Sequence, residues 1–101
     1  MPEFTPPKEM AIFHLYVAGE APNSMLALRN LTALCQSFYG DDYRIEVMDV
    51  LLSPESAWAA GVIVTPTLLR IAPLPIIQIM GNLSKIDQVL NALGLSGEYH
   101  D

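Results

Sequence analysis

Runs of apolar residues at two different periods predict alternating strands and helices in the first part of the chain. Residues 11–19 are rich in β-branched and aromatic residues, which is typical of a strand buried on both faces. The next apolar positions fall on one helical stripe, which comprises Leu28, Leu31, Cys35 and Phe38. We therefore expect a helix over residues 25–38, capped by Asn23 or Ser24 and ended by Gly40.

Strict alternation of polar and apolar residues predicts a second strand over residues 43–50, with one face wetter than the other. The two faces carry Tyr43, Ile45 and Val47 on one side and Arg44, Glu46 and Met48 on the other. A short helix should follow over residues 54–60. Ser53 can cap it, Pro54 suits its first position, and Glu55 suits the positive end of its dipole.

The most apolar part of the chain contains three prolines, which cannot donate to the hydrogen bonds of a sheet. We expect a strand that enters through residues 61–64, has Pro66 at a strand start and continues through residues 67–72. Prolines then suit a turn at residues 73–75, because their fixed φ is favourable there. Residues 76–80 should form the returning strand of a hairpin.

A final helix completes the predicted topology. Ser84 and Asp87 have the spacing of a capping box, and Gly94 can end the helix. Its apolar stripe comprises Ile86, Val89, Leu90 and Leu93. The order is then β-α-β-α-β-β-α, with a parallel pair joined by a right-handed crossover and an antiparallel hairpin. This is the thioredoxin-like α/β arrangement, a four-strand mixed sheet with helices on both faces.

Length and composition indicate one domain and disfavour several classes of partner. We place the domain at residues 11–95, between flexible tails at residues 1–10 and 96–101. A net charge of −6 with only five scattered Lys and Arg argues against nucleic acid. The longest apolar region, residues 57–80, is interrupted by glycine, proline and arginine, so we expect no membrane partner and a cytoplasmic location.

No catalytic, metal or cofactor site is expected. The only cysteine, Cys35, excludes an intrachain disulfide and is expected in the core. A reactive Cys-x-x-Cys motif would lie at the start of the first helix of this fold, but residues 21–24 read Ala-Pro-Asn-Ser. Ser24 has two interpretations, a helix cap or a hydroxyl for a glutathione-like thiol. His14 is expected in or near the core. The protein is therefore not expected to be an enzyme.

Several short motifs point to a family. "YVAG" followed by "PNS", "DVL" followed by proline, "TPTL", and "PLP" followed by "GNLS" stand in order along the chain. Together they resemble the KaiB family over residues 13–95, and also the KaiB-type sensor domain of an associated histidine kinase. The resemblance implies a non-catalytic regulator that binds a KaiC-like ATPase/kinase and modulates its phosphorylation state. A KaiA-like protein or a histidine kinase would be a further partner, in a clock or a clock-derived stress response.

The resemblance leaves two folds to choose between. In this family a tetrameric ground-state fold alternates with a thioredoxin-like monomer whose C-terminal half differs. Ala92 stands where clock-type relatives tend to carry glycine, and alanine favours a helix by about 1 kcal/mol. We therefore expect the thioredoxin-like fold, with the tetrameric KaiB fold as the alternative and self-association left open. The thioredoxin-like order further implies a cis peptide bond between Thr65 and Pro66.

Partner contacts are expected at the second strand, because an edge strand offers unpaired backbone groups. Arg44 and Glu46 are the first candidates. Arg70 is another, with a solvated surface arginine as its alternative. Clock-type relatives carry basic residues where this chain has Glu46, Gly61, Ile77 and Gln78. A divergent KaiB-like paralogue with a changed partner is therefore an alternative. A different class of function, a glutathione- or peptide-binding module without redox activity, would use the cleft beside Pro66.

Overall fold

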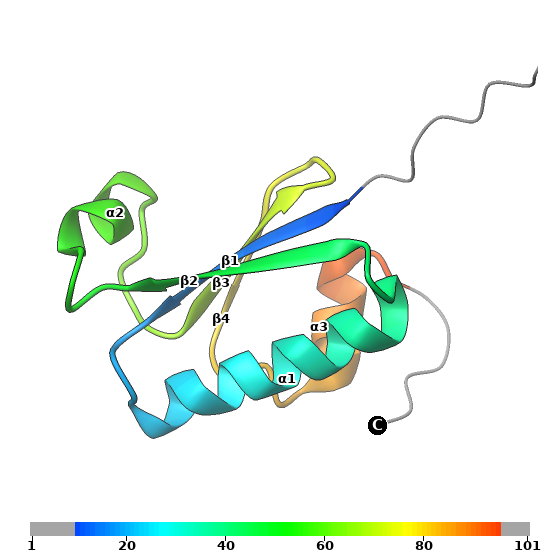
Figure 1. Ribbon diagram of the computed structural model, residues 1–101, viewed down its shortest axis with the longest axis horizontal. Coiled ribbons are helices and arrows are strands. Elements are labelled where there is room, and N and C mark those ends of the chain that lie inside the picture. The colour runs from blue at the N-terminus through cyan, green and yellow to red at the C-terminus, as the bar shows by residue number, and fades with distance from the viewer. Residues whose placement is uncertain (1–9, 96–101) are drawn as a thin grey trace, which may run out of the picture.

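The computed structural model describes residues 10–95, which form a four-stranded sheet and three helices (Figure 1). The tails predicted at residues 1–10 and 96–101 lie outside the described residues except for Met10. Along the chain the elements are β1 (Ala11–Val17), α1 (Pro22–Tyr39), β2 (Tyr43–Asp49), α2 (Pro54–Ala59), β3 (Thr67–Ala72), β4 (Ile77–Met80) and α3 (Ile86–Leu93). This confirms the predicted β-α-β-α-β-β-α order.

The strands are arranged in the order β2-β1-β3-β4. β1 and β2 are parallel, with Phe13 opposite Ile45, so the predicted crossover through α1 forms. β3 runs antiparallel to both β1 and β4, with Leu68 opposite Ile79 in the hairpin. β2 lies at one edge of the sheet, as expected, and β4 lies at the other.

Helices cover both faces of the sheet, as predicted (Figure 1). α1 and α3 lie on one face and enclose the larger core, whose fully buried side chains include Phe13, Leu15, Leu31, Leu34 and Leu68. α2 packs at one end of the opposite face, over a smaller cluster of Tyr16, Ala57, Val62 and Leu69. Because α2 has six residues and buries only Ala57, it leaves much of its own surface exposed.

The prediction that residues 61–64 enter as a strand is wrong, because β3 begins at Thr67. The amide of Val62 donates to the carbonyl of Ala57 at 2.9 Å, so the chain turns back onto the end of α2. The hydroxyl of Thr67 then donates to the carbonyl of Val64 at 2.7 Å and closes a turn before the strand. These local bonds make the apolar run a packed loop, in which Val62 is buried.

The first two helices begin with proline and use no side-chain cap. α1 begins at Pro22, three residues before the predicted start, so neither Asn23 nor Ser24 is its cap. α2 begins at Pro54 after Ser53, as predicted, but the Ser53 side chain makes no capping hydrogen bond. The physical reason is that proline has its φ preset for the first helical position and has no amide that requires a partner.

The start of α3 also differs from the prediction. The capping box of Ser84 and Asp87 does not form, because the helix begins after Lys85 and no side chain caps it. The amide of Ser84 donates instead to the Oδ1 of Asn82 at 3.0 Å, which makes a separate turn ahead of the helix. The predicted end is correct, since Gly94 has a φ of 71° in the left-handed region.

Candidate functional site

The start of α1, the position of the redox motif in this fold, contains a buried serine. Ser24 is 2% exposed, and its hydroxyl accepts a hydrogen bond from the amide of Ala18 at 3.2 Å. The side chain thereby ties the loop after β1 to the first turn of the helix. It does not cap α1, so the cap interpretation is wrong, and its burial and its bond to Ala18 hold the hydroxyl away from a glutathione-like thiol. The glutathione- or peptide-binding hypothesis, which would use the cleft beside Pro66, loses only the Ser24 hydroxyl as a hydrogen-bonding group.

Pro66, where the sequence predicts a cis peptide bond, lies directly before β3. The peptide bond between Thr65 and Pro66 is cis, and the bonds preceding Pro73 and Pro75 are cis as well. Pro66 is buried, and its carbonyl accepts a hydrogen bond from the amide of Gly81 at 2.9 Å. Pro66 therefore extends the β3–β4 ladder by one bond through its acceptor, which proline retains although it has no donor.

Cys35 is a buried thiol. It lies on the buried side of α1 with no exposed surface, as the sequence predicted. Burial in apolar surroundings disfavours the thiolate and raises the pKa of Cys35 to about 12. The thiolate is the nucleophile in disulfide exchange, so this residue cannot substitute for the missing Cys-x-x-Cys pair.

We expect Cys35 to resist alkylation in the folded protein. At pH 8 its modification by iodoacetamide should be at least about 100-fold slower than in the urea-unfolded chain, because burial removes both access and thiolate. The matched control is the double variant Cys35→Ala/Ser37→Cys, which moves the thiol to an exposed position of the same helix. Mass spectrometry over time gives both rates. Equal rates for folded Cys35 and the surface thiol would contradict the prediction.

The predicted contact residues of β2 lie on the sheet face that α1 and α3 do not cover. Arg44 and Glu46 are both exposed. The register places Glu46 beside His14 of β1, and its Oε2 lies 3.8 Å from the Nε2 of His14. His14 is half-buried on this face of the sheet and belongs to neither core cluster, so the sequence expectation of a histidine in or near the core is not met. Arg44 and Glu46 remain a predicted contact surface.

Arg70 is not at the surface. It is 7% exposed, so its alternative interpretation as a solvated arginine is wrong, and its guanidinium is not accessible to a partner in this fold. Its Nη1 donates to the carbonyl of Leu93 at 2.7 Å, and its Nη2 donates to the carbonyl of Pro75 at 3.2 Å. Arg70 therefore holds the end of α3 and the β3–β4 turn onto the sheet.

An exposed apolar surface around α2 was missed in the sequence. We call it the α2 surface: Leu51, Leu52, Trp58 and Ile63, which are 70%, 82%, 87% and 86% exposed. These residues belong to α2 and the loops that flank it, at one end of the molecule (Figure 1). One signal was available, since Leu51 and Leu52 stand directly before a Ser-Pro helix start, where polar loop residues are usual.

The described residues offer little else that could carry chemistry. Between residues 10 and 95, no group of three or more His, Cys, Asp or Glu side chains is placed to hold a metal ion. In the same range, no helix has both the length and the apolar character needed to cross a membrane.

Comparison with known proteins decides the family. The KaiB domain model matches residues 14–95. The chain belongs to the KaiB family. One relative, the circadian clock oscillator protein KaiB of Prochlorococcus marinus, is 42% identical over 89 residues, 88% of this chain and 75% of that protein. The circadian clock oscillator protein KaiB of Synechococcus elongatus is 40% identical over 96 residues, 94% of each protein.

Solved structures confirm which fold this KaiB-family chain has. The N-terminal domain of Synechococcus elongatus SasA matches with a TM-score of 0.73 and 17% identity, over 98% of both chains. Mitochondrial thioredoxin 3 of Saccharomyces cerevisiae matches with a TM-score of 0.64 and 21% identity, over 83% of this chain and 79% of that one. The fold is therefore thioredoxin-like, as the sequence predicted.

The KaiB motifs hold the loops of the molecule in place. Asn82 of "GNLS" donates to the Oδ1 of Asn23 in "PNS" at 3.3 Å, and its carbonyl accepts from the Nδ2 of Asn30 at 2.9 Å. Asp49 of "DVL" accepts two backbone amides, one from the loop before α1 at 3.0 Å and one from the loop before α2 at 2.9 Å. The motifs thus position the segments on which the exposed surfaces lie.

Proposed function

We propose that this KaiB-family protein is a non-catalytic regulator that binds a KaiC-type ATPase and modulates its phosphorylation state. Two of its relatives are circadian clock oscillator proteins with about 40% identity, which supports a role in a circadian clock or in a stress response derived from one. The start of α1 lacks the cysteines of a redox motif, and Cys35 is buried. Both observations support binding rather than thiol chemistry. A cytoplasmic location is part of this proposal, because the proposed partner uses ATP.

The observation that carries the proposal is the α2 surface. Single exposed apolar residues are ordinary on protein surfaces, but four large ones in one short segment are typical of a docking site. Trp58 in particular is 87% exposed, although tryptophan is among the residues that contribute most when buried at an interface. Covering this surface with a partner would remove that apolar area from water.

The β2 edge extends the proposed docking region. A partner strand can pair with the outer side of β2, because the sheet ends there. Arg44 and Glu46 would then set the specificity, since charges at the rim of an interface affect partner choice more than affinity. A KaiA-like protein or a histidine kinase is a candidate for this edge. Glu46, in place of a basic residue of clock-type relatives, favours a partner with a changed charge.

Complex formation with a KaiC homologue from the same organism tests the proposal. We expect co-elution in size-exclusion chromatography with multi-angle light scattering, in the presence of ATP, and a change in the phosphorylation of the KaiC homologue over time. The protein alone should have the mass of a monomer in this fold. A failure to form a complex with either the phosphorylated protein or a phosphomimetic variant would count decisively against the proposed function.

A further inference from the structure

The β4 edge of the sheet has an unused outer side. The amide of Gly81 donates inward to Pro66, and the register pairs Ile79 with Leu68 of β3. Because backbone groups alternate in direction along a strand, those of Gln78 and Met80 point outward. Within the described residues no strand pairs with this side of β4. It can therefore accept a further strand.

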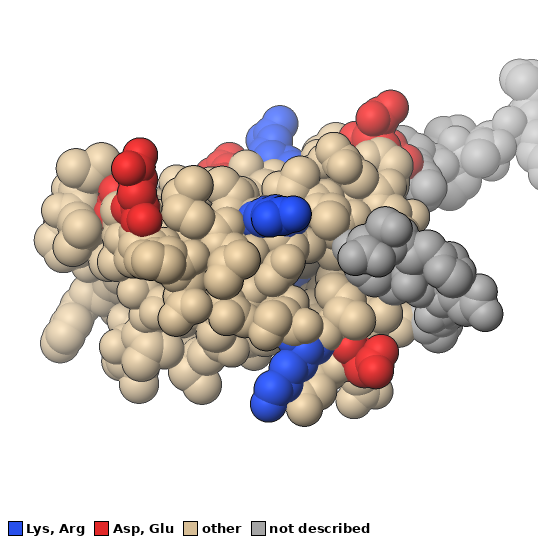
Figure 2. Space-filling model, turned by 90° about the horizontal axis from the view of Figure 1, so that it is seen from below, with Lys and Arg blue, Asp and Glu red and all other residues tan. Residues whose placement is uncertain are grey.

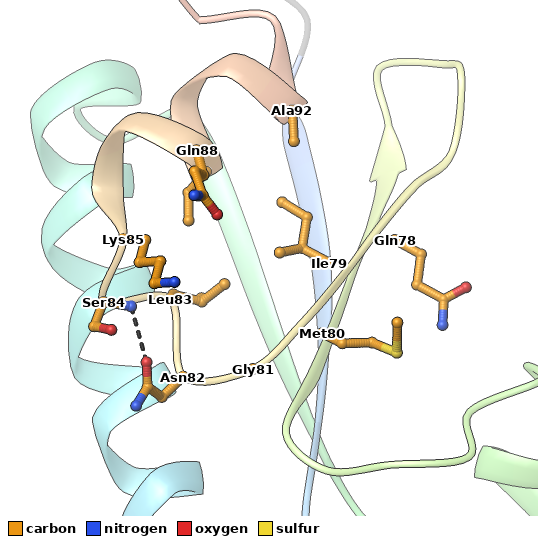
Figure 3. A pocket seen from close by; sticks show the side chains of 11 residues that line it. Gln78, Ile79, Met80, Gly81, Asn82, Leu83, Ser84, Lys85, Gln88 and Ala92 are labelled. Atoms are coloured by element: carbon orange, nitrogen blue, oxygen red, sulfur yellow. Dashed lines mark hydrogen bonds between the residues drawn. The ribbon is translucent and has the colours of Figure 1, made fainter.

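A hollow of about 490 Å³ lies between this edge and α3. Figure 3 shows Ile79 of β4 and Ala92 of α3 pointing toward one another across it, with Leu83 and Gln88 directed into the same space. The side chain of Met80, like that of Gln78, points to the other side of the sheet. The hollow is thus lined by the face of β4 that carries Ile79 and by one stripe of α3. This is the form of a groove beside an edge strand. We call it the β4–α3 groove.

The charge of the groove is positive although the chain as a whole is acidic. Among the described residues that line it, Lys85 is the only charged one. An adjoining hollow toward α1 shares Leu83 and Ser84 with the groove and contains Arg29. On the face covered by α1, Figure 2 shows Lys and Arg as separate side chains on a mostly uncharged surface. Such isolated cations match single carboxylates rather than a run of phosphates.

We propose that the β4–α3 groove binds an extended, mainly apolar segment of a partner protein that carries one carboxylate side chain. The segment adds to β4 as a fifth strand, and its alternate side chains enter the hollow over Ile79 and Ala92. Its carboxylate meets Lys85. A longer acidic run would fit less well, because the net charge of −6 repels it. β4 and β2 are opposite edges, so this site is independent of the proposed KaiC docking region.

Selection from a phage-displayed library of random heptapeptides tests the inference. We expect the selected peptides to alternate apolar residues and to contain one Asp or Glu. A synthetic peptide of the selected sequence should slow amide hydrogen exchange at Gln78 and Met80, because these amides become paired, and should shift the NMR signals of α3 near Lys85. Selection of no peptide, or signal changes confined to β2 and α2, would overturn the proposal.

Two variants of exposed residues give the energetic test. Ala92→Trp fills the hollow and should weaken peptide binding at least about 10-fold in fluorescence anisotropy, and Lys85→Glu should weaken it several-fold. Arg44→Glu, a charge reversal on the opposite edge, is the matched control and should leave binding unchanged. Circular dichroism checks that all three variants are folded. Peptide binding that Ala92→Trp does not weaken would refute the site. A dimer that forms without peptide and that Ala92→Trp dissociates would also refute it, because a second copy of the chain would then occupy the groove.

Discussion

Replacement of Arg70 by alanine should lower the free energy of unfolding by about 3–5 kcal/mol, the sum of a cavity and two lost hydrogen bonds. The side chain is 7% exposed and bonds to the carbonyls of Leu93 and Pro75, which belong to the end of α3 and to the β3–β4 turn. Loss of the guanidinium leaves both acceptors without this partner and opens a cavity in the main core. It also removes a positive charge from the negative end of the α3 dipole.

Arg70→Met separates the hydrogen bonds of the guanidinium from its packing. Methionine fills much of the same volume and does not bury a charge, and within residues 10–95 the Nε of Arg70 has no hydrogen-bond partner that could be lost. We therefore expect a smaller loss, about 1–3 kcal/mol. The matched control is Arg29→Ala on the exposed side of α1, which should change stability by less than about 0.5 kcal/mol.

Urea unfolding followed by circular dichroism gives these free energies. Light scattering on the same samples separates unfolding from self-association of a variant that has lost the contact between Arg70 and the end of α3. An Arg70→Ala variant within about 1 kcal/mol of the parent would show that the two hydrogen bonds contribute little.

Replacement of Trp58 by alanine should weaken the complex with a KaiC homologue by about 10- to 100-fold, the size of effect typical of a central aromatic residue at an interface. Trp58 is 87% exposed in the free protein, so its removal should leave the free energy of unfolding nearly unchanged. Binding is measured by biolayer interferometry with ATP present. Leu52→Asp, also on the α2 surface, should have a similar effect because it places a charge in an apolar contact.

Leu74→Ala is the matched control for the α2 surface. Leu74 is 76% exposed and apolar, but it lies in the β3–β4 turn rather than in or beside α2. Its replacement should leave binding within about two-fold of the parent. If Leu74→Ala weakened the complex and Trp58→Ala did not, the partner would dock elsewhere on the protein, and the assignment of the α2 surface would be wrong.

Local patterns along the chain determined the topology and the family. Alternation over residues 43–50 and the stripe from Leu28 to Phe38 each reflect a period that one element imposes on its own residues. The order of these elements then left few possible connections, so the crossover, the hairpin and the exposed β2 edge were predictable. Arg44 and Glu46 were placed correctly on the sheet face that α1 and α3 do not cover, because the alternation of side chains along a strand is local. The motifs identified the KaiB family for the same reason, since they are contiguous stretches.

Only the tertiary structure decided where the side chains of the remaining candidates lie. Arg70 looks like a surface arginine in the sequence, and its burial depends on a carbonyl 23 positions away that folding brings within 2.7 Å. The loop at residues 61–64 has the composition of a strand but packs against α2 instead of pairing. Trp58 is exposed because a six-residue helix at the end of a sheet can bury only one side of itself. Each outcome depends on contacts between segments distant in sequence, and no local period encodes such contacts.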